Sequence, residues 1–385
     1  MKNNNKFRLD VWGAITLGTI ALYALFLLYP MAYLIRQSVL DPDTGGFTLA
    51  YFTKFFSKSY YFDTLINSFK VSITATVLSI AIGTPLAYLF TIFKIKGKSV
   101  LNILIVVASM SAPFIGAYSW ILLLGRSGII TTFFKNLGIA IPDIYGFGGI
   151  VLVMTLQLFP LVFLYAKGAL KNIDNSLIEA AENLGCSGIV CFFKVVVPLI
   201  MPTLLAAALL VFMRSFADFG TPMLIGEGYM VLPVLVYNEY MSEIGGNAHL
   251  ASALSVVVVL CSTTVLLVQK YFVSRKNYVM TAMRPPKEEV LHGGKRFLVT
   301  LPVLLVTLIG IMPQIVVIVS SFIKCDFTGF QKGFSLDSYA TIFNRLWTNI
   351  RNTFVFSSIA IVFIIILGML ISYIVVRQKG LAGQL

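Results

Sequence analysis

The chain has 385 residues, of which 58% are hydrophobic and 12% are charged, and its formal net charge is +13. Its mean hydropathy of +0.89 is far above what the core of a water-soluble domain absorbs, so the composition excludes a soluble globular protein. The net charge does not indicate a nucleic-acid partner, because the basic residues are spread over alternate loops instead of forming one patch.

Apolar runs of about 20 residues recur along the chain, and each is long enough to cross a bilayer as a helix. Their length favours helices over barrel strands of about 10 residues, and a helix satisfies its own backbone hydrogen bonds inside lipid. We therefore predict an all-α fold, a polytopic transmembrane helical bundle. The predicted spans are approximately 11–35, 68–93, 100–124, 148–166, 199–216, 250–273, 297–323 and 352–376.

Three basic residues, Lys2, Lys6 and Arg8, precede the first predicted span, as they do in a secretory signal peptide. The apolar run is too long for such a peptide, and no small-x-small cleavage site follows Tyr29-Pro30. We expect this segment to remain as a membrane helix.

The loops between the spans alternate in charge, which predicts the orientation of the chain. Loops rich in lysine and arginine stay in the cytoplasm, and here they share a side with the N-terminus. We therefore expect a multi-pass protein of the cell (inner) membrane, surrounded by membrane lipid, with a cytoplasmic N-terminus. The basic residues on that side include Lys94, Lys96, Lys98, Lys167, Lys171, Lys194, Lys270 and Lys295, and the acidic residues on the other side include Asp41, Asp43, Asp63, Asp143, Glu227, Glu239, Glu243, Asp326 and Asp337.

A weak internal repeat predicts two modules in tandem. Phe47-Thr48-Leu49 and Asn67-Ser68-Phe69 are echoed by Phe334-Ser335-Leu336 and Asn352-Thr353-Phe354. We expect a first module over 1–283, a polar cytoplasmic linker over 284–296, and the start of a second, incomplete module over 297–385, which stops before any second copy of the Glu-Ala-Ala segment found at 179–181. The first module would hold six spans and the second two.

A short polar segment lies between the fourth and fifth predicted spans. Ser176 and Glu179 have the spacing of a capping box, so we expect Ser176 to cap a helix that begins at Leu177. Gly185 can adopt the left-handed conformation that ends such a helix. The small residues Ala180 and Ala181 would leave a face that another protein can approach closely.

The full pattern over 176–202 is Glu-Ala-Ala, three residues, Gly, nine residues and Val-x-Val-Pro. It resembles the cytoplasmic EAA loop of ABC-type importer permeases, in which this loop forms the coupling helix that seats in the ATPase subunit. The resemblance implies a MetI-like permease fold and a coupling role for Glu179, Ala180, Ala181, Gly185 and Pro198. It also implies a chain that is not an enzyme and has no cofactor of its own. ATP and magnesium would be bound by ABC ATPase subunits, and an extracytoplasmic binding protein would deliver the substrate.

The outer end of the fifth span carries two ionisable residues, Arg214 and Asp218, followed by the helix-breaking residues Gly220 and Pro222. Being four apart, Arg214 and Asp218 would form an ion pair at the membrane interface, or alternatively lie beside the translocation path. The segment 215–226 resembles that of ferric-iron type fused two-module permeases, and phosphonate, polyamine and thiamine permeases can share it. We therefore expect ferric iron as the substrate, with those three classes as alternatives.

Other classes of function find little support in the sequence. Gly97-Lys98-Ser99 resembles the end of a phosphate-binding loop, but Ile92 stands where that loop needs glycine. The cysteine spacing does not predict a zinc site. The outer residues Glu239, Glu243 and His249 are weak evidence for a site of any other metal, so we expect no metal site. The alternative from another class of function is an ion-coupled secondary transporter. Such a transporter would need a carboxylate within the membrane, and the predicted spans offer only Asp218, at the end of the fifth span.

Overall fold

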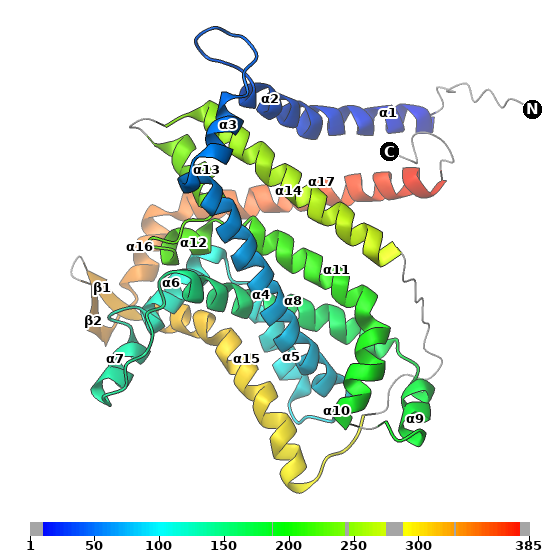
Figure 1. Ribbon diagram of the computed structural model, residues 1–385. Helices are drawn as coiled ribbons and strands as arrows, with labels where there is room; N and C mark the ends of the chain where they lie inside the picture. The colour runs from blue at the N-terminus through cyan, green and yellow to red at the C-terminus, as the bar shows by residue number, and fades with distance from the viewer. Residues whose placement is uncertain (1–10, 187, 243–245, 275–287, 327–328, 378–385) are drawn as a thin grey trace, which may run out of the picture. The chain divides into compact units, whose positions relative to one another are not determined.

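The computed structural model describes residues 11–186, 188–242, 246–274, 288–326 and 329–377. Apart from one two-stranded hairpin, the regular elements of these ranges are helices (Figure 1). Two compact units can be separated by their internal contacts, one formed by Asp41–Val319 and the other by Met1–Leu40 with Ser320–Leu385. The all-α prediction is confirmed.

The larger unit contains the helices that matter for the candidate site. The last of them, α15, extends two residues beyond this unit. They are α3 (Ala50–Ser57), α4 (Ser59–Ile92), α5 (Lys98–Ala108), α6 (Pro113–Leu124), α7 (Ile129–Asn136), α8 (Phe147–Lys171), α9 (Asn175–Asn183), α10 (Gly188–Cys191), a π-helical turn (Phe192–Val196), α11 (Val197–Phe216), α12 (Gly220–Ile225), α13 (Leu232–Met241), α14 (Ala248–Ser274) and α15 (Gly293–Ser321).

The smaller unit joins the two ends of the chain, and within it α1 contacts α17. Its two strands pair antiparallel. Its elements are α1 (Val11–Tyr23), a π-helical segment (Ala24–Leu28), α2 (Tyr29–Ser38), β1 (Ile323–Asp326), β2 (Gly329–Phe334), α16 (Asp337–Arg345) and α17 (Trp347–Arg377).

Eight helical segments of the described ranges are long and apolar enough to cross a membrane, in agreement with the predicted number. Apart from the third span, the largest differences from the predicted starts are at Ser59 and Gly188, where the amphipathic residues before the apolar run continue the same helix. The third is placed differently, at Pro113–Asn136, and includes both α6 and α7.

Among the predicted spans, the helix over 100–124 is the one clear error, because the structure breaks it between α5 and α6. Pro113 lacks an N–H and disfavours helical geometry at Ala112, whose ψ is 141°. The carbonyl oxygens released at the break accept hydrogen bonds from other helices, Ser111 from Gln157 and Ala108 from Gln314. The break is therefore satisfied by protein groups, as a membrane interior requires.

The centre of the larger unit is the contact between α4 and α8. At Gly83 a Cβ atom would lie 2.8 Å from the Cβ of Val162 and 2.9 Å from the Phe159 carbonyl oxygen, so only glycine permits this approach. The rings of Phe90 and Phe163 meet edge to face at 5.2 Å near one end of the same interface. Both helices are thereby fixed along their length.

Within this unit the helix ends gather in two places, which we name the α9 end and the α12 end. The α9 end contains the end of α4, the start of α5, the end of α8 and α9 itself, whereas the α12 end contains the start of α8, the end of α11 and α12 (Figure 1). The described basic residues Lys94, Lys167 and Lys194 lie at the α9 end.

The local order of elements repeats as the sequence suggests. Phe47-Thr48-Leu49 is followed by the short helix α3 and the long α4, and Phe334-Ser335-Leu336 is followed by the short α16 and the long α17. The module boundaries at 283 and 296 remain predictions. Residues 284–287 of the predicted linker lie outside the described residues, and α15 begins within the linker at Gly293. The contact units divide the chain elsewhere.

Candidate functional site

Helix α9 at the α9 end is the predicted coupling element, but its start differs from the prediction. It begins at Asn175, and Asp174 is the N-cap, with its Oδ1 accepting from the Ser176 N–H at 3.0 Å. Ser176 therefore lies inside the first turn and is not the cap. Glu179 accepts from the Asn175 side chain at 2.5 Å instead of reaching back to a Ser176 amide.

The end of α9 agrees with the prediction. Gly185 has φ of 82°, in the left-handed region. Its N–H donates to the Glu182 carbonyl and the Cys186 N–H donates to the Ala181 carbonyl, both at 2.9 Å. This pair of bonds is a Schellman motif, which closes the helix by satisfying carbonyl groups of its last turn.

The two alanines of α9 do not share one free face. Ala180 is exposed, whereas Ala181 is buried against the protein. The exposed apolar side chains lie just beyond the helix, where Leu184 is 88% and Ile189 77% exposed. Apolar side chains so exposed next to a polar helix are typical of a surface that binds another protein.

The segment after α9 connects this surface to the α12 end. Helix α10, the π-helical turn and α11 run without a break from Gly188 to Phe216. The turn is anchored by Phe192, whose ring lies 4.8 Å from that of Tyr88 on α4. Pro198 is the second residue of α11, directly after the turn, and Pro202 lies further inside α11.

At the α12 end, Asp218 does not pair with Arg214, so the predicted ion pair is wrong for these two described residues. Arg214 is exposed, and Asp218 turns instead to the start of α12, where its Oδ1 accepts from the Gly220 N–H at 3.0 Å. Burial raises the pKa of the Asp218 carboxyl above its ordinary value, although the bond from Gly220 opposes this shift.

Helix α11 ends at Phe216 and α12 starts at Gly220, which confirms the predicted helix break. Gly220 packs closely on α6, where a Cβ atom would lie 3.1 Å from the Cβ of Pro113. Asp218 and Pro222 line a narrow crevice together with Ser68 of α4. The structure thus brings Asp218 and Pro222 together and leaves Arg214 outside.

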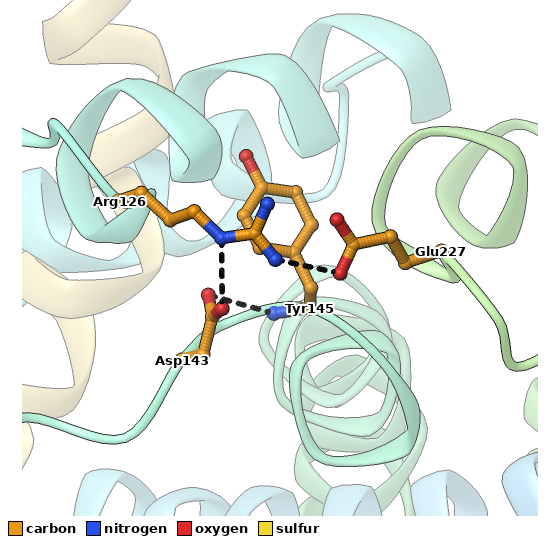
Figure 2. Close-up of polar contacts among 4 residues, drawn as sticks. All are labelled: Arg126, Asp143, Tyr145 and Glu227. Carbon is orange, nitrogen blue, oxygen red and sulfur yellow. Dashed lines mark hydrogen bonds and ion pairs between the residues drawn. The ribbon is translucent and has the colours of Figure 1, made fainter.

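A polar cluster at the α12 end was not found by sequence reasoning. Arg126 donates from Nε to Asp143 at 3.2 Å and from an Nη nitrogen to Glu227 at 2.9 Å, and its guanidinium lies 4.8 Å from the Tyr145 ring (Figure 2). It thereby joins the turn after α6, the segment before α8 and the loop after α12. Glu227 has φ of 51°, unusual for a residue with a side chain.

No group of three or more histidine, cysteine, aspartate or glutamate residues close enough to hold a metal ion occurs among the described residues. Of the outer residues considered from sequence, His249 stacks on Tyr51, and Glu243 lies outside the described residues.

These features define a polytopic helical membrane protein with a capped helix at one end and a helix break at the other. The chain belongs to the family of binding-protein-dependent transport system inner membrane components, whose model matches residues 44–278. The predicted family is therefore confirmed.

Relatives of known name match over different parts of the chain. The ferric transport system permease protein FbpB of Actinobacillus pleuropneumoniae is 26% identical over 392 residues, covering 98% of this chain and 55% of its own length. The spermidine/putrescine transport system permease protein PotB of Haemophilus influenzae is 30% identical over 264 residues, covering 66% of this chain and 89% of its own. The chain thus spans about half the length of the ferric transport relative.

Among solved structures, a chain of the bacterial ABC transporter involved in import of the acidic polysaccharide alginate matches with a TM-score of 0.58 and 14% identity. The match covers 69% of this chain and 95% of that chain. At this identity it establishes the fold, which is that of ABC importer permeases.

Proposed function

We propose that the chain is the transmembrane permease of an ATP-binding cassette importer, with its N-terminus and the α9 end in the cytoplasm. The observation that carries this proposal is α9, a nine-residue helix with an Asp174 cap, a Gly185 stop and exposed apolar residues beside it. Such a short helix, capped at both ends, suits a docking role on an ATPase subunit. The excess of lysine at the α9 end supports the orientation.

The mechanism we infer is alternating access driven from the α9 end. ATP bound with magnesium would close two partner ATPase subunits, and their movement would displace α9. The uninterrupted helical segment from Gly188 to Phe216 would carry that displacement to Asp218 and α12. Because the helix is broken there, the two sides of the break can change their angle and open the crevice toward the binding protein.

We infer that ferric iron is the substrate. The match to FbpB extends over 98% of the chain, whereas the match to PotB covers 66%. The higher identity to PotB favours a polyamine as the second candidate, and phosphonate and thiamine follow from the resemblance at 215–226. Uptake of labelled ferric iron and of labelled spermidine, each with its binding protein, separates the first two candidates.

The class of transporter is tested in proteoliposomes that contain the protein with its ATPase and its loaded binding protein. We expect uptake to need ATP on the ATPase side and to continue when a protonophore and a sodium ionophore abolish ion gradients. Uptake by the permease alone, driven by a proton or sodium gradient without ATP, would show that it is an ion-coupled secondary transporter.

A further inference from the structure

A cavity of about 410 Å³ opens at the α9 end, between the last turn of α4, the first turns of α5 and the last turns of α8. Three of its lining residues are lysines, and Ser99 and Asn102 also line it. The only carboxylate among its described lining residues belongs to Glu288. The lining lysines are Lys98, Lys167 and Lys171.

The positive charge of this cavity is only partly balanced. Lys98 pairs with Glu288, its Nζ lying 2.6 Å from Oε1. Lys167 donates to the neutral Asn102 amide oxygen at 2.5 Å and lies 5.1 Å from the centre of the Phe90 ring. Neither Lys167 nor Lys171 has a carboxylate within ion-pair distance in the described part of the chain. An anion in the cavity would relieve the repulsion among these ammonium groups.

The start of α5 adds hydrogen-bond donors to the same cavity. Lys98 and Ser99 are the first two residues of this 11-residue helix, so the N–H groups of its first turn have no intrahelical acceptor. The helix dipole also places partial positive charge there. Gly97-Lys98-Ser99 is not part of a nucleotide-binding loop, but its backbone and side chains present the kind of donors that bind phosphate oxygens.

The carboxylate of Glu288 is held at the cavity by the backbone beside it. Glu289 donates from its N–H to the Ile92 carbonyl at 2.8 Å, and its own carbonyl accepts from the Lys94 N–H at 3.0 Å. These bonds attach the chain before α15 to the end of α4. Glu288 therefore occupies, at Lys98, the place that an external anion would take.

We propose that this cavity binds a phosphate group and that Glu288 competes with it for Lys98. The group is supplied either by the headgroup of an anionic phospholipid, because the cavity lies where transmembrane helices end, or by free phosphate from solution. The proposal goes beyond the transport function and does not depend on it, since neither α9 nor the crevice at Asp218 takes part.

Two binding measurements on the full chain distinguish the two sources. Equilibrium dialysis of the detergent-purified protein with labelled inorganic phosphate measures the free anion. Native mass spectrometry after reconstitution in equal parts phosphatidylglycerol and phosphatidylcholine measures retained lipid. Saturable binding of phosphate identifies the soluble source, and selective retention of phosphatidylglycerol identifies the lipid source.

Variants test whether the binding occurs in this cavity. Lys167→Gln and Lys171→Gln should each weaken it roughly tenfold, because each removes a charge-assisted hydrogen bond. Glu288→Gln should strengthen binding by removing the competing carboxylate. The matched control is Lys96→Gln, since Lys96 is exposed in the same loop and does not line the cavity.

The proposal is overturned if neither probe binds saturably, if Glu288→Gln leaves binding unchanged, or if Lys96→Gln weakens it as much as Lys171→Gln does. Lys171 is exposed, so its replacement leaves the fold intact and the result can be interpreted. Thermal unfolding of each variant without ligand verifies this.

Discussion

Gly185 is the residue whose conformation was best predicted from sequence, because that conformation depends on its sequence neighbours alone. Its φ of 82° and the two bonds that close α9 confirm a left-handed helix stop. By contrast, the Ser176 cap was wrong by two positions. Asp174 and Ser176 are both good cap residues, and the Glu179 spacing favoured the wrong one.

We expect Gly185→Val to abolish the stimulation of ATPase activity by loaded binding protein while membrane insertion persists. A β-branched residue in the left-handed region costs about 1–2 kcal/mol, so α9 would end differently. A Cβ atom here meets nothing within 4 Å, and the effect should therefore come from backbone strain. ATPase assays on reconstituted complexes measure it.

Gly185→Asn is the matched control for this prediction, since asparagine tolerates the left-handed conformation and should retain most of the stimulation. Near-normal transport by Gly185→Val would contradict the docking role of α9.

The carboxyl group of Asp218 should make stability depend on pH. Its pKa is raised by burial, so the folded state holds this proton more tightly than the unfolded state does. Stability is then lost as the pH rises from about 3.9, the ordinary value, through the folded pKa.

Asp218→Asn removes that loss and keeps an oxygen acceptor for the Gly220 N–H. We expect the variant to unfold at a higher temperature than the parent at neutral pH, with a difference that shrinks as the pH is lowered toward 4. Thermal unfolding in detergent across this range measures it. A difference that is independent of pH would show that ionisation of Asp218 is not the cause.

At the scale of elements, sequence periodicity predicted the long helices and missed the places where one helix contacts another. The break between α5 and α6 has a local signal, Pro113, but its stability depends on Gln157 and Gln314, which lie far away in sequence. The Arg126 cluster is harder still, because Arg126 and Glu227 are 101 residues apart. Only the folded arrangement of helices brings such residues together.

The contact of α4 with α8 gives a prediction at this scale. Gly83→Ala should destabilise the protein by about 1–3 kcal/mol, because the new methyl group would meet the Phe159 carbonyl oxygen and Val162 and force the helices apart. The midpoint of thermal unfolding in detergent should fall.

Gly168→Ala is the control, because Gly168 lies on the same helix pair with open space at its Cβ position. Alanine there should be neutral or stabilising by up to about 1 kcal/mol, from helix propensity. Equal effects of the two substitutions would mean that close helix packing at Gly83 is not a source of stability.

For the whole molecule, charge distribution predicted more than composition did. The alternation of basic and acidic loops distinguishes the α9 end from the α12 end without reference to any relative. Within the larger unit, α4 and α8 end and α5 and α10 begin at the α9 end, as that pattern requires (Figure 1). The charge pattern does not identify the substrate. The described residues that line the crevice at Asp218 come from separate helices, and they include no set of groups specific for one ligand.

The orientation itself is testable by labelling single cysteines, in a background where Cys186, Cys191, Cys261 and Cys325 are replaced by serine. Asp43 and Lys96 are both exposed, and one predicted membrane crossing, α4, separates them.

An impermeant thiol reagent should therefore label Asp43→Cys in intact cells and Lys96→Cys only in inverted vesicles. Leu184→Cys should behave like Lys96→Cys, because two candidate spans, Pro113–Asn136 and α8, lie between them. Permeabilised cells, in which all three positions should be labelled, provide the control. If Asp43→Cys and Lys96→Cys were labelled from the same side, α4 would not cross the membrane, and neither α9 nor the phosphate cavity could be assigned to the cytoplasm.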